Sequence, residues 1–341
     1  PPSGVMSGIY STDTDILPDS NRAPCDTCTP VNREPRQDMK NQCGNPGKSA
    51  DDSYATLMNQ RGGITGMRIT MLIIFLLLTS PGMASDPWQS LAAGMDLGTF
   101  AASRPSSSGD SRITVLRIDP DLWSLEFTGL SLDDESSGRT ARQWSKAHDF
   151  TAAINAGMFG TDYRTHVGYL RFRNHINNDN VNAYQSVAAF DPRREGLPHF
   201  RIFDLDSPGV SMEAILRDYA SAVQNLRLIK RPGQNRWSQQ GKMWSEAALG
   251  EDESGRMLFI FCRSPYTMHD LNNELLGLGI GLVSAQHLEG GPEAQLYVNA
   301  GGVELEISGS HGTSFQETDG ISMNWPIPNV LGVRPRIPGN R

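Results

Sequence analysis

Residues 294–309, with the sequence AQLYVNAGGVELEISG, decide the class of fold that the chain predicts. Apolar side chains alternate along both halves of this stretch, which meet at the turn 299–302. The alternating residues are Leu296, Val298, Val303, Leu305 and Ile307. A period of two is typical of a strand with one buried face, and consecutive glycines permit a tight turn. The stretch therefore predicts a β-hairpin.

Two carboxylates lie at the turn just before this hairpin, in SAQHLEGGPE, residues 284–293. Gly290, Gly291 and Pro292 are explained by the turn itself, because glycine supplies backbone freedom and proline fixes φ. Turn formation does not explain the acids Glu289 and Glu293. Since functional loops often begin at strand ends, the sequence makes Glu289 a candidate functional acid.

Further strands are predicted between residues 112 and 160 and again at 256–262. RITVLRIDP at 112–120 and LWSLEFTGLS at 122–131 predict two strands joined by a turn, which we expect to form an exposed-edge hairpin. RMLFIFC at 256–262 predicts a buried strand. TAAINAGMFG at 151–160 predicts a buried run that ends at glycine.

Three helices are predicted between these strands. Residues 139–150 favour a short helix, and 211–229 give the strongest helical pattern, with Ser211 as its N-cap. Thr267 with Asp270 resembles a capping box at the start of a third helix. Because no regular βαβ rhythm is present, the sequence predicts an α+β fold of mixed or antiparallel sheets with packed helices, in a single domain.

The chain is predicted to have four parts. Residues 67–85, MRITMLIIFLLLTSPGMAS, resemble a secretory signal peptide cleaved near Ala84; the apolar run is about half of the roughly 20 residues that a membrane span needs. Residues 1–66 are expected to be disordered or to come from a mis-assigned translation start, 86–110 to be a linker, and 111–341 to be the functional domain.

Composition and cysteine content exclude several classes of protein. The chain is 38% hydrophobic and 20% charged, with a formal net charge of −8, so it predicts a globular protein that does not bind nucleic acid. Cys25, Cys28 and Cys43 lack a fourth zinc ligand nearby, and no metal site is predicted. Cys262 is expected to be a buried, inert thiol.

The familiar nucleophile, phosphate-loop and zinc-protease motifs are missing from the sequence. Polar residues instead gather at glycine-rich element ends: Asn155, Asp162, His166, Glu246, Arg263, Ser264, His287, Glu289 and Glu293. Cleavage of a sugar linkage needs an acid and a stabilising carboxylate, and a phosphate leaving group needs a cation. The residues suit hydrolysis of an acetal or a phosphate-linked sugar, although each of them also has a plain structural interpretation.

Four segments resemble the phosphodiester glycosidase family, over a match from about Ile113 to Val333. The segments are INAGMFG, AALGEDESGRMLFIF, CRSPYTMHDLNNELLGLG and HLEGGPEAQLYV. The resemblance implies a hydrolase of that type. On this resemblance we assign catalytic roles to Glu289 as acid or nucleophile, Arg263 as anion anchor and Asn155 as an orienting group. Glu246, which is not a family residue, is predicted from its residue type to be a second carboxylate.

Residues predicted to bind substrate are Gly157, His166, Ser264, His287, Gly290 and Gly291. No cofactor is evident, and a divalent cation is left open. The chain departs from the family where Glu289 replaces aspartate, where Glu246-Ala247 replaces an arginine-threonine pair, and at Pro292-Glu293. We expect Glu246 and Arg263 to share one pocket, and the substrate to carry less charge than the diester cleaved in that family.

The sequence therefore predicts an exported glycosidase, periplasmic or secreted, that hydrolyses a sugar-phosphodiester or related linkage in an envelope or extracellular glycan. Its predicted partner is a carbohydrate or sugar-phosphate, with no nucleic acid and no stable membrane span. Two alternatives stay open: a non-catalytic glycan-binding envelope protein, with Trp237, Trp244 and Tyr266 as aromatic platforms, and a conventional glycosidase using Glu246 and Glu289.

Overall fold

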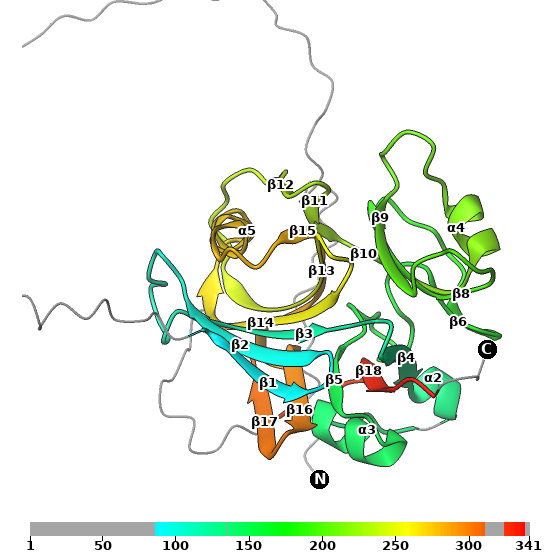
Figure 1. The fold of residues 1–341 in the computed structure, drawn as a ribbon, viewed down its shortest axis with the longest axis horizontal. Helices are drawn as coiled ribbons and strands as arrows, with labels where there is room; N and C mark the ends of the chain where they lie inside the picture. Colours follow the sequence, from blue (N-terminus) through cyan, green and yellow to red (C-terminus); the bar gives the residue numbers. More distant parts are fainter. Residues whose placement is uncertain (1–85, 135, 311–323, 338–341) are drawn as a thin grey trace, which may run out of the picture. The chain divides into compact units, whose positions relative to one another are not determined.

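A computed structural model describes residues 86–134, 136–310 and 324–337, which belong to one compact unit of the chain, Asp86–Arg341. The predicted signal peptide at 67–85 and the predicted upstream segment at 1–66 lie outside the described residues. Figure 1 shows the described unit as three β-sheets with a few short helices. Every strand pair in the described part of the chain is antiparallel.

The largest sheet has eight strands. Their spatial order is β1 (Trp88–Ala92), β2 (Met95–Ala101), β3 (Arg112–Ile118), β14 (Met257–Tyr266), β13 (Trp244–Asp252), β15 (Leu282–Gly290), β11 (Arg227–Lys230) and β12 (Gln234–Asn235). Central strands β13 and β14 are almost wholly buried, which explains their continuous apolar runs.

The two other sheets have five strands each. One has the order β7 (His175–Asn178), β6 (Leu170–Phe172), β10 (Tyr219–Asn225), β8 (Ser186–Pro192) and β9 (Phe200–Asp204). The other has the order β17 (Val303–Ser308), β16 (Gln295–Ala300), β5 (Ala152–Asn155), β18 (Asn329–Pro335) and β4 (Trp123–Gly129). The second of these sheets contains the hairpin predicted at 294–309, and both turn glycines have positive φ, 59° at Gly301 and 79° at Gly302.

The helices are short, so the predicted α+β class with packed helices overstates their share of the fold. They are α2 (Leu130–Asp133), α3 (Ala141–His148), α4 (Met212–Asp218), α5 (Met268–Gly277) and the 3-10 turn η1 (Gly291–Glu293). Three of them each cover one face of a sheet: α3 packs on β5 and β16, α4 on β8 and β10, and α5 on the eight-stranded sheet (Figure 1). The fold is mostly antiparallel β.

The helix predicted at 211–229 is wrong beyond its first two turns. Ser211 caps α4 as expected, by accepting a hydrogen bond from the N–H of Ala214 at 3.2 Å, but the helix ends at Asp218 and β10 follows at once. Tyr219 and Val223 are four residues apart, a spacing that fits one helix face or one strand face equally well. Pairing of β10 with both β6 and β8 decides for the strand.

The hairpin predicted across 112–131 is also wrong, although both strands exist. β3 pairs with β2 and β14, whereas β4 pairs with β18 in a different sheet. Asp119 and Pro120 therefore lead from one sheet to another. A turn signal between two strands does not specify whether those strands pair, because pairing depends on partners distant in sequence.

The segment 86–110, predicted to be a linker, contains β1 and β2 and is part of the eight-stranded sheet. Met95 is completely buried, and the rings of Trp88 and Phe100 pack edge to face with their centres 5.2 Å apart. The serine-rich stretch that suggested a linker is confined to the loop after β2. That loop is anchored by the Ser106 hydroxyl, which donates to the carbonyl of Pro265 at 2.6 Å.

The helices predicted at 139–150 and after Thr267 are confirmed as α3 and α5. Thr140 and Gln143 form a capping box on α3, and the Thr267 hydroxyl accepts a hydrogen bond from the N–H of Asp270 at 3.1 Å. In the described part of the chain, no helix is both long and apolar enough to cross a bilayer.

The eight-stranded sheet separates two hydrophobic clusters. Ala247 and Leu249 pack in the central core between the three sheets, while Ala248 packs in the cluster beneath α5. Successive residues of a strand point to opposite faces, so β13 contributes to both clusters.

Candidate functional site

The turn that contains Glu289 is built at the end of β15. Gly290 ends the strand, and Gly291 begins η1 with a φ of +65°. A Cβ atom on Gly290 would lie 2.6 Å from Cδ1 of Trp244, so the indole ring packs directly against this glycine. Gly291 is therefore explained by its backbone conformation, and Gly290 by the close packing of the Trp244 ring.

Glu289 is buried, with only 5% of its surface exposed. Its Oε1 accepts a hydrogen bond from the N–H of Gly290 at 3.1 Å, while Oε2 is buried and has no hydrogen-bond partner. Burial raises the pKa of this carboxyl to about 7; the charge of His287 opposes that shift, and Glu293 and Glu246 add to it. A carboxyl with this pKa exists in both protonation states near neutral pH, as acid-base chemistry requires.

Asn155 lies at the end of β5 and holds η1 in place. Its Nδ2 donates to the carbonyl of Glu293 at 2.9 Å, and its Oδ1 accepts from the N–H of Gln295 at 2.7 Å. Both ends of the amide are thus engaged with the turn. The structure supports a positioning role for Asn155, by which β5 fixes the turn that follows Glu289.

Arg263 approaches the same turn from β14. Its Nε donates to the carbonyl of Ser308 at 3.2 Å, and the next residue, Gly309, donates its N–H to the carbonyl of Ala294 at 2.8 Å. A Cβ atom on Gly309 would lie 1.9 Å from the carbonyl oxygen of Gly291. The structure therefore brings Arg263, Asn155 and the Glu289 turn to one place.

Glu246 and His287 form a buried pair beside this turn. His287 Nδ1 lies 2.6 Å from Glu246 Oε1, and Trp244 Nε1 donates to Glu246 Oε2 at 3.0 Å. Burial alone would lower the pKa of His287, but the carboxylates of Glu246 and Glu289 outweigh that effect and raise it. Burial also raises the pKa of Glu246, while the charge and hydrogen bond of His287 and the hydrogen bond from Trp244 oppose that rise, so the two side chains form a coupled carboxyl–imidazole pair.

The prediction that Glu246 and Arg263 share a pocket receives no support. Glu246 opposes Cys262 across the β13–β14 ladder, and the register of that ladder shifts between this pair and the pair of Trp244 with Tyr266. The two side chains also have different partners: His287 and Trp244 for Glu246, and the carbonyl of Ser308 for Arg263. Burial, His287 and Trp244 account for the shifted pKa of Glu246.

Gly157 and His166 lie together in the loop after β5. A Cβ atom on Gly157, whose φ is +151°, would lie 2.2 Å from His166 Cε1 and 2.3 Å from Asn225 Oδ1. His166 Nε2 lies 3.0 Å from the carbonyl of Gln224, which makes Nε2 the protonated nitrogen, and burial lowers the pKa of the ring to about 4. His166 is therefore a neutral framework histidine whose Nδ1 is buried without a partner.

Ser264 contacts the loop that follows β2. It is buried, and its hydroxyl accepts a hydrogen bond from the N–H of Ser111 at 2.8 Å. Ser264 thus anchors the loop that follows β2, a segment that the sequence had assigned to a linker, and its role in substrate binding stays a prediction.

Two residues that lie near the predicted site residues were not predicted from the sequence. Tyr184 precedes β8, and both burial and the charge of Glu289 raise its pKa, so the phenol lies near that acid. Asn225, buried at the end of β10, donates from Nδ2 to the carbonyl of Ala156 at 3.0 Å. No local signal marks either residue, because both reach the site through sheet pairing.

Among the proposed aromatic platforms, only Trp244 is at the site. Trp237 donates its indole N–H to the carbonyl of Arg227 at 2.8 Å, and Tyr266 donates its hydroxyl to the carbonyl of Arg104 at 2.7 Å. These two bonds explain Trp237 and Tyr266 as packing residues.

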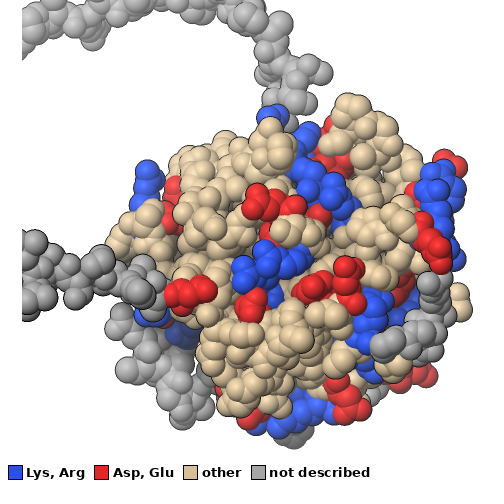
Figure 2. All heavy atoms as spheres, in the orientation of Figure 1, with Lys and Arg blue, Asp and Glu red and all other residues tan. Residues whose placement is uncertain are grey.

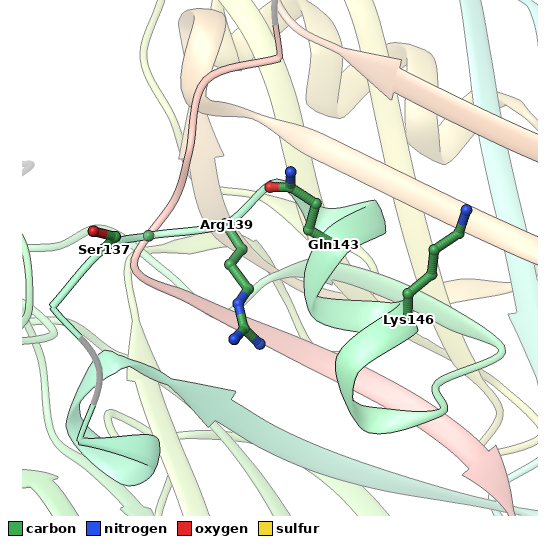
Figure 3. Close-up of a pocket in the computed structure, with 5 residues that line it drawn as sticks. Ser137, Arg139, Gln143 and Lys146 are labelled. Atoms are coloured by element: carbon green, nitrogen blue, oxygen red, sulfur yellow. The ribbon is translucent and has the colours of Figure 1, made fainter.

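A shallow pocket beside α3 is lined by Ser137, Gly138, Arg139, Gln143 and Lys146 (Figure 3). The side chains of Arg139 and Lys146 point away from one another in Figure 3, so their charges do not converge on one ligand. None of the predicted site residues lines this pocket.

The described surface carries a mixture of positive and negative side chains. Figure 2 shows Lys and Arg side chains interspersed with Asp and Glu on the face drawn, without a broad basic patch. Within residues 86–134, 136–310 and 324–337, no group of three or more His, Cys, Asp or Glu side chains is arranged to hold a metal ion.

Comparisons with known proteins identify the class of this fold. Residues 148–334 match the family model for phosphodiester glycosidase, and the chain belongs to that family. The family resemblance noted in the sequence is thereby confirmed. Hydrolases that act on phosphodiester-linked sugars define the family. A comparison with curated protein sequences gives no match.

Two solved structures share the fold. One is the catalytic domain of zebrafish N-acetylglucosamine-1-phosphodiester alpha-N-acetylglucosaminidase, described as auto-inhibited by its pro-peptide. It aligns with a TM-score of 0.54 and 13% identity, over 73% of this chain and 86% of that one. The other is a hypothetical protein from Synechocystis, with a TM-score of 0.52 and 13% identity, over 74% of this chain and 64% of that one. At this identity the likeness establishes the fold alone.

Proposed function

We propose that this protein hydrolyses the bond between a sugar and a phosphate, or a related glycosidic linkage, and that Glu289 is the working acid. Family membership supports the reaction class. The observation that carries the proposal is the buried Glu289 carboxyl, whose Oε2 has no partner and whose pKa is raised to about 7, at the turn where Asn155 and Arg263 converge.

The chemistry assigned to Glu289 follows from its environment. A carboxyl group in its acid form donates a proton to a leaving oxygen, and in its ionised form it stabilises or traps the cationic sugar. Because a phosphate leaves readily as an anion, a nearby cation matters more for this substrate than a strong acid does. Arg263 is the proposed cation, since its guanidinium reaches the strand adjoining the Glu289 turn.

The conventional glycosidase with two working carboxylates is disfavoured. Glu246 is completely buried, and its two oxygens contact His287 and Trp244, so it has no free oxygen to offer a substrate. The non-catalytic glycan-binding alternative loses two of its three aromatic platforms, because Trp237 and Tyr266 bind the backbone elsewhere.

We further propose that the protein is exported and that it acts on an envelope or extracellular glycan. The apolar run within 67–85 supports export. The observation that tests it is the N-terminus of the protein recovered from cells, since a start near Ser85 requires cleavage by a signal peptidase. A chain recovered in the cytoplasm with residues 67–85 intact would contradict it.

A panel of glycosyl phosphodiesters and plain glycosides tests the reaction. Release of sugar from the phosphodiesters is expected, and cleavage of plain glycosides alone would contradict the phosphodiester assignment.

The variant Glu289→Gln tests the role of the acid. We expect kcat to fall by about 100-fold or more, the usual size of a general acid-base contribution, because the amide cannot exchange a proton. Glu293→Gln, which removes the same charge from the same turn, serves as the control and should retain most of the activity. Full activity of Glu289→Gln on a substrate that the unmodified enzyme cleaves would exclude Glu289 from the reaction.

A further inference from the structure

Glu246 is enclosed in a way that a substrate-contacting carboxylate is not. None of its surface is exposed, and both oxygens are engaged: Oε1 lies 2.6 Å from His287 Nδ1, and Oε2 accepts from Trp244 Nε1 at 3.0 Å. Donation from Nδ1 to a carboxylate fixes both the tautomer and the orientation of an imidazole. The state of His287 therefore depends on Glu246.

The pairing of β13 with β15 places this pair next to Glu289. Glu246 opposes Gly290, Ala247 opposes Glu289, and Ala248 opposes His287, with an irregularity between the last two pairs. Such a bulge re-aims side chains without breaking the ladder. Along this ladder, the Ala247–Glu289 pair therefore lies between the pair that contains Glu246 and the pair that contains His287.

We propose that Glu246 is a positioning residue, which holds His287 as a cation beside Glu289 and so sets the protonation state of the working acid. This assignment rests on the proposed function, because Glu289 must be the acid that meets the substrate. It replaces the predicted role of Glu246 as a second catalytic carboxylate.

The charged groups around His287 support this arrangement. Glu246 on β13 and Glu289 on its own strand both stabilise the imidazolium, while Cys262 on β14, near Glu246, is a buried neutral thiol whose pKa is raised. Glu293 in η1 acts on Glu289, and Tyr184 before β8 is affected by the Glu289 charge. The charge of His287 in turn lowers the pKa of Glu289 against the effect of burial.

Glu246→Gln is an informative change because an amide cannot satisfy both neighbours. If its oxygen accepts from His287 Nδ1, its NH2 group faces the Trp244 N–H; if the amide is flipped, His287 Nδ1 must become an acceptor. In either orientation the anion that stabilises the imidazolium is lost. Glu251→Gln is the matched control, since Glu251 is an equally buried carboxylate on the same strand whose partners are Ile202, Arg201 and Arg231.

The first test measures the protonation of His287 by NMR titration of the imidazole nitrogens in the full chain. The signal is assigned by its loss in His287→Asn. We expect His287 in the unmodified protein to titrate above the ordinary value of 6.5, to titrate lower in Glu246→Gln, and to be unchanged in Glu251→Gln. An identical His287 titration in Glu246→Gln and the unmodified protein would overturn the proposal. If Glu246→Gln does not fold, the unmodified protein decides, since titration at or below 6.5 contradicts the proposal.

The second test uses the pH profile of the reaction. With the His287 charge lost, the limb of the kcat/KM profile that belongs to Glu289 should move to higher pH in Glu246→Gln and stay in place in Glu251→Gln. A uniform loss of rate without movement of the limb would show a purely structural role. The two proposals fail separately: if no sugar phosphodiester is cleaved, the proposed function fails, while the NMR titration still tests the contact between Glu246 and His287.

Discussion

Glu289 couples the chemistry of the site to the stability of the fold. Its pKa is about 7 in the folded protein and 4.5 when unperturbed, so the folded state binds the proton more tightly than the unfolded chain. Stability from this group is therefore greatest at low pH and declines as pH rises from about 4.5 to about 7. The buried Glu289 carboxyl therefore lowers the stability of the fold at neutral pH.

Glu289→Gln should consequently stabilise the protein while it removes activity. The free energy of unfolding relative to the unmodified protein should rise across pH 4.5 to 7 and then level off, with a total change of up to about 3 kcal/mol from a shift of this size. Urea unfolding at several pH values measures it. A constant difference between the two proteins across this range would mean that Glu289 has an ordinary pKa.

Residue types alone indicated which residues are candidates for the site, but not which other residues each of them contacts. Glu289 and Arg263 were selected from the sequence because each is a charged residue near a glycine-rich strand end, and their catalytic roles stay predictions. The contacts of Ser264 and Glu246 could not be predicted, since the same local pattern is compatible with an anchored loop or a buried pair. Their roles depend on Ser111 and His287, which are distant in sequence.

Among the elements, η1 depends most on other parts of the chain. Asn155 from β5 binds the carbonyl of Glu293 in η1 and the N–H of Gln295 at the start of β16, across a sequence separation of about 140 residues. The N–H of Gly309, after β17, donates to the carbonyl of Ala294. A three-residue turn cannot fix its own geometry. The strands on either side therefore keep Glu289 in position.

Asn155→Ala should loosen this turn. We expect a loss of about 1–3 kcal/mol in stability, because a buried backbone N–H and a carbonyl lose their partners, together with a fall in kcat as Glu289 moves. Thermal unfolding and hydrolysis assays measure the two effects. Asn180→Ala, at an exposed asparagine, is the control. Unchanged activity in Asn155→Ala would show that the turn holds its geometry without β5.

Helices and strands were predicted correctly where the sequence pattern fits only one type of secondary structure. The hairpin at 294–309 combines alternation with a Gly-Gly turn, and α5 has its Thr267 cap, so neither required knowledge of distant partners. The helix predicted over 211–229 was wrong in its second half because the spacing of Tyr219 and Val223 fits both a helix and a strand. Pairing with β6 and β8 makes this part of the chain a strand.

At the scale of the whole molecule, β1 and β2 complete the largest sheet. They pair with each other and cover the side of β3 that β14 does not, and they bury Leu91 and Met95. An unpaired central strand with apolar side chains is a site of aggregation. The functional domain therefore begins near Asp86 and not at residue 111.

Removal of these strands tests that boundary. A chain starting at Ser103 should be insoluble or lack a cooperative unfolding transition, whereas a chain starting at Asp86 should fold. Size-exclusion chromatography and circular dichroism distinguish the two outcomes. A soluble, active chain without β1 and β2 would show that residues 86–101 are dispensable, as a linker would be.

The way in which η1 is held has a consequence for the timing of activity during synthesis. Until β5, β15 and β17 have come together, Glu289 is an ordinary solvated carboxyl, and Arg263 has not met the turn. A nascent or unfolded chain thus lacks the raised pKa of Glu289, and on the proposed function hydrolysis would begin only when these strands have assembled.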